Sequence, residues 1–355
     1  MELKELIYSL SSVMTISGFG LRNVGEVESL IGEHFDESYR DGVGNIVFIK
    51  RSKRPIADGE RRAKILIDAH LDEIGMIVTD ILDGGFLTVT NIGGIDPALL
   101  QASDVCIYGK EKIFGVISST PPHLSGPDDR NKHKNIEALY IDTGYKKEDL
   151  EKLVRLGTPV GFAPVYKELM NMKMSGKSFD DKACAACAAY AIANTPAEEL
   201  YGDVYLLLSN FEETSAHGGV TPGTYNVMPD YAMVIDVNLA EVPDTKKTET
   251  VEMNKGPSIT YSTSTDRRLT RMLEKACKAS EIPLQISLSP SYTGTNAVSL
   301  QLVGNGIPTV DIGLPLAFMH SPTEMISLKD CEALVKVVET FIKDESIGRE
   351  YGYEE

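Results

Sequence analysis

The sequence is organised around the stretch Val204-Tyr205-Leu206-Leu207-Leu208-Ser209-Asn210-Phe211-Glu212-Glu213. Its apolar first half predicts a buried strand, and two adjacent carboxylates follow where that strand should end. Neighbouring residues in an extended chain point to opposite sides, so Glu212 and Glu213 are expected to have different roles. One can bind a metal ion while the other takes a proton from a water on that ion. A solvated Glu pair at a strand end is the alternative that this stretch leaves open.

A second apolar run, Ile65-Leu66-Ile67, predicts another buried strand, of the kind found in parallel sheets. It leads to His70, and an extended continuation would place Asp72 on the same face. A metal-binding His usually donates its other ring N–H to a carboxylate, so Asp72 is the expected partner of His70. A purely structural histidine beside the strand is the alternative interpretation.

Three further candidate ligands follow along the chain. Asp180 is expected at the N-cap of an Ala-rich helix, where Asp is favoured as a cap and a carboxylate could also bridge two cations. Asp181 beside it is favoured by the helix dipole. Asp236 is an acid inside an apolar strand, and a buried charge there needs a partner or a metal. His320 follows a predicted strand.

The fold class predicted from this pattern is α/β, because predicted strands alternate with helices around a mixed sheet. Ligands of such sheets gather at the carboxyl ends of strands, which is where the candidate residues fall. Between residues 73 and 172 the pattern changes to short alternating strands separated by Gly- and Pro-containing loops. This predicts a small β-rich domain inserted into a main domain of residues 1–72 and 173–355. Such a small domain can hardly bury its apolar residues alone, so self-association through it is expected.

Composition excludes several classes of partner. The net charge of −17 argues against nucleic acid or an anionic membrane surface. The chain contains no apolar run near the roughly 18 residues of a membrane span, and its N-terminus lacks a signal pattern. Five scattered cysteines argue against a disulfide framework, so a cytoplasmic location is expected. Cys184 and Cys187 form a CxxC pair, which its Ala-rich surroundings favour as helix packing.

The candidate ligands form a nitrogen and oxygen donor set. It comprises two histidines, two aspartates and one or both of the paired glutamates. This set suits zinc, cobalt or manganese and differs from a closed structural thiolate site.

Nine short motifs, in this order, extend over most of the chain. They are Asp-Gly-x-Gly-Asn (41–45), Asp-Ala-His-x-Asp-Glu-Ile-Gly (68–75), Gly-Gly-x-Asp-Pro (93–97), Pro-Pro-His-Leu (121–124), Gly-Lys-x-x-Asp-Asp-Lys (176–182), Glu-Glu (212–213), Pro-Asp (229–230), Ile-Asp-Val (235–237) and His-Ser-Pro-x-Glu (320–324). Together they resemble the M42 metallo-aminopeptidases, the TET-like and glutamyl aminopeptidase group.

The resemblance implies a site with two divalent metal ions, zinc or cobalt first and manganese as a further option. His70, Asp180 and Asp236 would bind one ion. Asp180, Glu213 and His320 would bind the other, with Asp180 bridging. Asp72 would be the partner of His70 and Glu212 the general base on a metal-bridging water. The inserted domain looks like the family's dimerisation domain, and dimers in this family often build a dodecamer.

Two departures from the family pattern stand out. Thr214-Ser215-Ala216-His217-Gly218 replaces the usual Val-Gly-Leu-Arg-Gly, and Gly294-Thr295-Asn296-Ala297 replaces Gly-Thr-Asp-Ala. Neither departure removes a ligand. By resemblance both lie near the cleft, so they leave the preferred N-terminal residue of the substrate open.

The predicted activity is that of a metallo-aminopeptidase, a peptide hydrolase that removes N-terminal residues from peptides. Two alternatives are a non-catalytic assembly or binding homologue and a glycosidase, because some relatives carry a cellulase label. Glycosidases normally use two carboxylates at a fixed separation without a metal. The metal-rich donor set therefore favours the peptidase.

Overall fold

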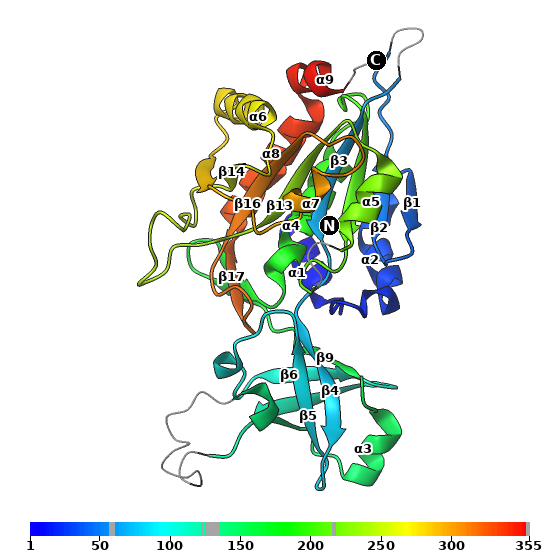
Figure 1. The fold of residues 1–355 in the computed structure, drawn as a ribbon, viewed down its shortest axis with the longest axis vertical. Helices are drawn as coiled ribbons and strands as arrows, with labels where there is room; N and C mark the ends of the chain where they lie inside the picture. The colour runs from blue at the N-terminus through cyan, green and yellow to red at the C-terminus, as the bar shows by residue number, and fades with distance from the viewer. Residues whose placement is uncertain (57–60, 122–123, 125–134, 215–217, 353–355) are drawn as a thin grey trace.

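The computed structural model describes residues 1–56, 61–121, 124, 135–214 and 218–352, so His217 lies outside the described residues. A large body and a smaller β-barrel lie end to end (Figure 1). The helices are α1 (Leu3–Ser12), α2 (Val24–Ile31), α3 (Lys147–Leu153), α4 (Phe179–Asn194), α5 (Val220–Val227), α6 (Arg267–Ala279), α7 (Ala297–Leu300), α8 (Leu328–Lys343) and α9 (Glu345–Tyr351).

An eight-stranded mixed sheet forms the centre of the large body. Its spatial order is β1 (Glu37–Arg40), β2 (Ile46–Lys50), β12 (Asp203–Ser209), β3 (Lys64–His70), β13 (Tyr231–Leu239), β16 (Thr309–Leu316), β14 (Ser258–Ser262) and β15 (Gln285–Ser289). The four central strands β12, β3, β13 and β16 are parallel to one another. The predicted α/β class with a mixed sheet is therefore confirmed.

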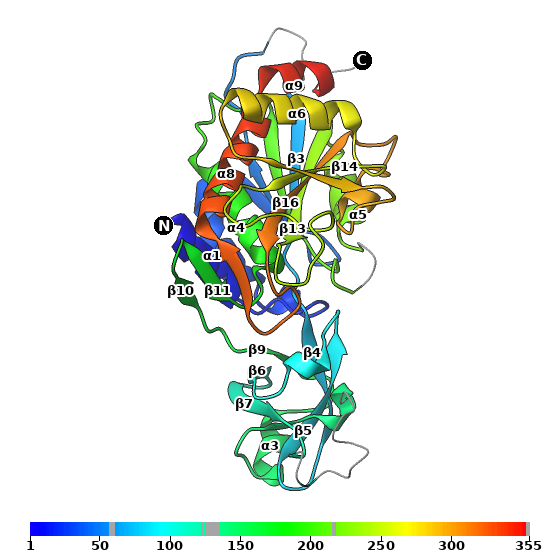
Figure 2. The same cartoon turned by 90° about the vertical axis from the view of Figure 1, so that its left-hand side faces the viewer.

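Alternation along the central strands sends successive side chains into two different cores. In β3, Ile65 and Ile67 belong to the core formed with α1, α4 and α8, whereas Leu66 belongs to the core formed with α5 and α7. Figure 2 shows α4 and α8 on one side of the sheet and α5 on the other. The small side chains of the Ala-rich α4 let its backbone lie close to β3 and β13, and its N-terminal end is thereby held near their carboxyl ends.

The barrel follows β3 directly. Its strands, in order around the barrel, are β4 (Gly75–Ile81), β5 (Phe86–Ile92), β8 (Tyr140–Asp142), β7 (Lys112–Ser118), β6 (Asp104–Tyr108) and β9 (Pro159–Phe162). The short strands expected between residues 73 and 172 are therefore present. The barrel has its own apolar core, separate from the two cores of the large body.

A three-stranded sheet joins the barrel to the large body. It contains β10 (Lys167–Leu169), β11 (Lys173–Gly176) and β17 (Glu324–Ser327). β10 falls within the predicted inserted segment, yet it pairs with β11. The domain boundaries at residues 72 and 173, and dimerisation through the insert, stay predictions. Among the described residues no helix is long and apolar enough to cross a membrane.

Candidate active site

Strand register brings His70 and Asp236 to one edge of the sheet. In β3, His70 is the last residue and lies opposite Ser209 of β12. In β13, Asp236 lies opposite Gly313 of β16. Leu66 and Val234 lie on the face of the sheet that α5 and α7 cover. His70 and Asp236 follow them by four and two residues, so they lie on the same face. Their ring nitrogen and carboxylate oxygen, His70 Nε2 and Asp236 Oδ1, are 3.8 Å apart.

The start of α4 differs from the expectation. Ser178, with φ of 54°, occupies the N-cap position that was expected for Asp180. The helix begins at Phe179, but Asp180 and Asp181 have non-helical backbone angles. The reason is tertiary, because the backbone N–H groups of Phe179 and Asp180 both donate to the Glu324 carboxylate, at 2.7 and 3.1 Å. Asp180 therefore points at the sheet edge and does not cap the helix.

Asp180 lies between the two predicted histidine ligands. Its Oδ1 is 3.1 Å from His70 Nε2, and its Oδ2 is 3.3 Å from His320 Nε2. The same His320 Nε2 atom is also 3.3 Å from Glu213 Oε2. The five side chains predicted as metal ligands thus lie together, two from strands (His70 and Asp236), one from a helix start (Asp180) and two from loops (Glu213 and His320).

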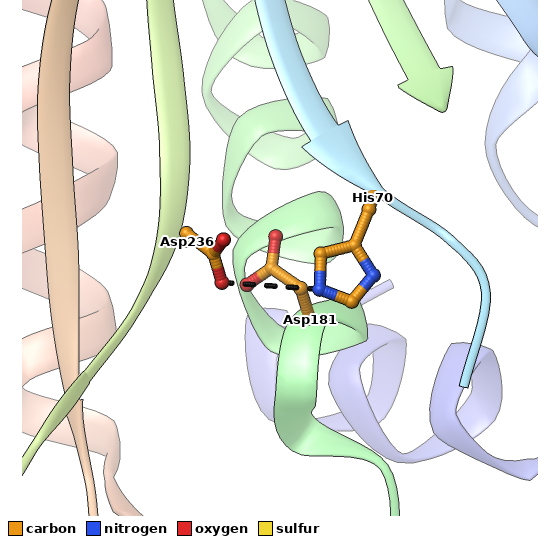
Figure 3. Close-up of side chains that lie close together, drawn as sticks. All are labelled: His70, Asp181 and Asp236. Atoms are coloured by element: carbon orange, nitrogen blue, oxygen red, sulfur yellow. Dashed lines mark ion pairs between the residues drawn. The ribbon is translucent and has the colours of Figure 1, made fainter. Parts of the chain in front are cut away.

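Asp181 also belongs to this cluster, although it was predicted only as a favourable charge near a helix start. His70, Asp181 and Asp236 each offer one ligand atom, and these atoms lie within 4.8 Å of one another (Figure 3). His70, Asp180 and Glu213 form a second such group. Neither oxygen of Asp181 has a nitrogen or oxygen hydrogen-bond partner among the described residues. An Asp-Asp pair at a helix start was the only signal for this second acid.

The paired glutamates are separated by a turn and not by strand alternation. β12 ends at Ser209, and Glu212 and Glu213 lie in a turn that follows Phe211, whose φ is 62°. The expectation of an extended chain at this point is therefore wrong. The turn still directs the two carboxylates differently. Glu213 lies against His320, whereas the Glu212 Oε2 is 4.0 Å from His70 Nε2.

Asp72 connects the glutamate turn to His70. Its carboxylate oxygens accept the backbone N–H groups of Glu212 and Glu213, at 3.1 and 3.2 Å. The His70 Nδ1 forms its hydrogen bond with the Asp72 backbone carbonyl, at 2.9 Å, and lies 3.6 Å from the Asp72 carboxylate. Asp72 therefore touches His70 as expected, but its side chain mainly positions the two glutamates.

Glu324 is a second positioning residue, and no role was predicted for it. It is buried on β17, and besides the N–H groups at the start of α4 it accepts the backbone N–H of His320 at 3.3 Å. One carboxyl group thus fixes the backbone of two candidate ligands, Asp180 and His320. Burial raises the pKa of Glu324 to about 8, and the negative charge of Asp180 adds to this.

The cluster contains more negative than positive charge. Burial, with the charges of neighbouring acids, raises the pKa of Asp181 and of Asp236 well above the ordinary value and that of Glu212 to about 7. For Asp180, burial opposes ionisation, but hydrogen bonds with the two histidines lower its pKa. Hydrogen bonds with Asp180 and Glu213 raise the pKa of His320 to about 11. Bound divalent cations would offset this excess, and the imidazole and carboxylate donors fit them.

A second buried group of charges lies beside the first. The Glu73 carboxylate contacts Lys177, Ser178 and Lys182, with the Lys182 Nζ at 3.0 Å. It also accepts the backbone N–H of Thr15. Burial opposes ionisation of Glu73, but the two lysines lower its pKa to about 2. We call these residues, Glu73, Lys177, Ser178 and Lys182, the lysine cluster.

Of the two departures from the family pattern, one lies in the described residues. The Asn296 amide donates to Asp68 Oδ2 and to Ser209 Oγ, both at 2.9 Å. Asp68 is two residues before His70 on the same face of β3. Asn296 therefore supports the strand ends behind the site and does not enter the ligand cluster.

The cluster opens into a cavity of about 370 Å³. His70, Asp180, Glu212, Asp236 and His320 line one part of it. The rest is formed by residues from the end of β13, from β14, β15 and β16, from the segment 293–295, and by Met319. A substrate can thus reach the candidate ligands from this side.

Comparison with known proteins identifies the family of the chain. The sequence profile of the family described as M42 glutamyl aminopeptidase matches residues 44–337. The lysyl aminopeptidase of Pyrococcus furiosus is 27% identical over 347 residues, which cover 96% of each chain. A TET aminopeptidase from a marine sediment Thaumarchaeota archaeon has 30% identity and a TM-score of 0.89, with 98% of each chain covered. The Pyrococcus horikoshii TET1 peptidase, which can assemble into a tetrahedron or a large octahedral shell, has 29% identity and a TM-score of 0.82, covering 97% of this chain and 100% of that one.

The profile match extends over most of the chain. The chain therefore belongs to the M42 glutamyl aminopeptidase family, and it is a peptide hydrolase. The family is metal-dependent, and the described residues include candidate metal-binding groups.

Proposed function

We propose that this M42 enzyme is a dinuclear metal-dependent aminopeptidase that removes N-terminal residues from peptides. The observation that supports two metal ions is the position of Asp180, whose two oxygens each lie against a different histidine. A further carboxylate lies on each side, Asp236 next to His70 and Glu213 next to His320. Such an arrangement fits one carboxylate shared between two cations.

The proposed ligands are those that the resemblance to the M42 family implied. His70, Asp180 and Asp236 would hold one ion, and Asp180, Glu213 and His320 the other. Zinc or cobalt are the proposed ions, with manganese as a further option, because the donors are imidazole and carboxylate. When bound, such ions make a water more acidic and polarise a carbonyl group.

Glu212 is the proposed general base. Its carboxylate reaches the cavity beside His70 without being one of the proposed ligands. In that position it can take a proton from the attacking water and pass it to the leaving amine. Asp72 holds the Glu212 backbone N–H and so fixes where this carboxylate lies.

The names of the relatives support cleavage at the N-terminal end. Two of the similar proteins are called aminopeptidases, from Pyrococcus furiosus and from the marine archaeon. We carry over the aminopeptidase activity but not the substrate preference, because identities of 27–30% leave room for a different pocket.

The test is a panel of aminoacyl p-nitroanilides assayed with zinc, cobalt and manganese, beside a β-glucan. We expect metal-dependent release of the N-terminal residue that a chelator abolishes and added metal restores. Glucan hydrolysis that survives the chelator would favour the glycosidase instead. Fewer than one bound ion per chain, with no gain from added metal, would favour a non-catalytic homologue.

We also propose that the chain forms homo-oligomers, from a dimer up to a dodecamer, through residues 73–172. On the outer face of β7, Phe114 and Val116 are 63% and 43% exposed. Changing both to Glu should lower the native mass measured by light scattering, because the charges would oppose apolar contact between copies. Leu302→Glu, at a position of the large body that is 74% exposed, is the matched control. An unchanged mass in the double variant would contradict the proposal.

The proposed location is the cytoplasm. All five cysteines are free and buried in the described structure. Free thiols are typical of reducing compartments. Fractionation of the native cells, with activity followed in each fraction, tests this.

A further inference from the structure

The cavity beside the candidate ligands changes character with depth. At its rim, Leu239 and Leu288 are 49% and 74% exposed. At its inner end the lining side chains are polar and buried, with Thr260, Thr293 and Asp311 each at most 5% exposed. An apolar rim above a polar floor suits a side chain that has an aliphatic stem and a polar tip.

Asp311 supplies the charge at this floor. In β16 it lies opposite Val234 of β13, two residues before Asp236. Two residues along a strand correspond to roughly 6.6 Å, so Asp311 lies about that far below the ligand row, on the same face of the sheet. The aliphatic stem of a long side chain can span this distance.

The described partners of Asp311 are hydroxyl groups. Its Oδ1 accepts a hydrogen bond from Thr295 Oγ1 at 2.7 Å, and Thr260 also contacts the carboxyl group. Within the described part of the chain, none of the residues that line the cavity is Lys or Arg. The acids beside the histidines are accounted for by the proposed metal ions, whereas Asp311 is not among the proposed ligands. Burial raises the pKa of Asp311, and a cation held beside the carboxyl group would favour its ionised form.

We propose that Asp311 selects substrates whose N-terminal residue has a cationic side chain, Lys or Arg. The inference rests on the proposed aminopeptidase function and names its substrate class. The aliphatic stem would pack against Leu288 and Leu239 while the charged end reaches Asp311. A glutamate side chain would meet a like charge in the same place, so this chain should differ from the glutamyl specificity in its family's description.

Asp311 could instead contact the α-ammonium group that every N-terminal residue carries. The two possibilities differ in one measurable way. If Asp311 binds the side chain, its loss affects lysine substrates and spares substrates with norleucine, the neutral analogue of similar length. If it binds the α-ammonium group, both substrates lose activity equally, and the proposal is overturned.

The experiment compares Lys, norleucine and Glu p-nitroanilides with the metal-loaded wild-type enzyme and with Asp311→Asn. We expect the wild type to prefer Lys over norleucine by about 10-fold or more in kcat/KM, the value of a hydrogen bond to a charged group, and to cleave Glu least. Asp311→Asn should reduce the Lys preference by the same factor while its metal content and norleucine activity stay close to wild type.

A matched control is Asp330→Asn, at a buried aspartate outside the cavity that accepts the backbone N–H groups of Asn254 and Gly256. This variant should lose stability and keep the Lys-to-norleucine ratio. Should Asp311→Asn fail to fold, the wild-type preference alone decides, because a preference for norleucine or Glu overturns the proposal. Failure to hydrolyse any of the three substrates with any metal would instead contradict the proposed aminopeptidase function.

Discussion

Two buried groups of charged side chains flank the start of α4, and they are balanced in different ways. In the lysine cluster, Glu73 is paired with Lys177 and Lys182, so the charges are balanced by the protein itself. We call Asp180, Asp181, Glu212, Glu213 and Asp236 the acidic cluster. These five carboxyl groups lie near His70 and His320, and their described contacts include no lysine or arginine. The lysine cluster is buried, whereas in the acidic cluster His320 and Glu212 are partly exposed.

This difference in charge balance indicates a structural role for the lysine cluster and a chemical role for the acidic cluster. Glu73 joins the chain before β4 to Lys177 and Lys182, on either side of the Asp180-Asp181 pair. It thereby fixes the place where barrel, N-terminal segment and α4 meet. In the acidic cluster the two histidines are the only basic side chains among the described contacts, so negative charge remains in excess, and bound metal ions would offset it. The comparison predicts that removing a charge costs stability in one group and activity in the other.

The largest expected effect is on catalysis, in the pair Glu212 and Glu213. Glu212→Gln should keep both metal ions and the fold, yet reduce kcat by about 10²–10⁴-fold, because only proton transfer is lost. Glu213→Gln should lose a metal ion together with activity, because it is a proposed ligand. Metal analysis and kcat for both variants check this. If Glu212→Gln loses metal while Glu213→Gln keeps it, the two roles are exchanged.

The next effect is on stability, in the lysine cluster. Glu73→Gln should lower the free energy of unfolding by about 3–5 kcal/mol, because two buried lysines lose their counter-charge. Urea denaturation of the metal-free protein measures this. The double variant Glu73→Gln with Lys182→Met should recover part of the loss, since one uncompensated charge is removed. A Glu73→Gln protein as stable as the wild type would show that the lysines do not need this partner.

The free energy of unfolding of the wild type should differ from that of Glu73→Gln in a way that depends on pH. The pKa of Glu73 is lowered from 4.5 to about 2 in the folded state. Its stabilisation, about 3 kcal/mol for a shift of this size, is therefore fully present above pH 4.5 and lost as the pH falls through 2. The stability difference between wild type and Glu73→Gln should shrink over this window. A difference that grows as the pH falls would be inconsistent with this assignment.

The smallest effect is expected at Asp181, which lies in the acidic cluster but is not a proposed ligand. Asp181→Asn should weaken metal binding by about 10–100-fold, as changes beside ligands commonly do, with kcat near wild type once metal is saturating. Metal titration followed by activity measures both quantities. If the variant binds one ion fewer at saturation, Asp181 is itself a ligand, and the ligand set predicted from the sequence is incomplete.

Much of the site could be predicted because strands have a simple period. Residues two apart share a face, so the apolar runs already place His70 at the end of one buried strand and Asp236 inside another. The resemblance to the M42 family then gave Asp180, Glu213 and His320, already candidates from the sequence, their expected roles as ligands. Their proximity in the structure agrees with that prediction, although their roles as ligands stay untested.

The positioning residues could not be predicted in this way. The Glu324 carboxylate reaches the N–H groups of Phe179 and Asp180, which are 145 and 144 residues away along the chain. The turn after Phe211, and not strand alternation, separates Glu212 from Glu213. Such contacts join segments far apart in the chain, and neither segment's sequence predicts its partner.

The sequence by itself determined the α/β class, the buried strands that lead to His70 and contain Asp236, and the Ala-rich helix that follows Asp180, because these follow from periods of two and 3.6 residues. The tertiary structure alone decided that Asp181 joins the ligands, that Glu73 is matched by two lysines, and that Asp311 forms the floor of the cavity. The physical reason is that these contacts depend on strand order and register. Both are set by packing between segments far apart in the chain, whereas the periods act only between near neighbours.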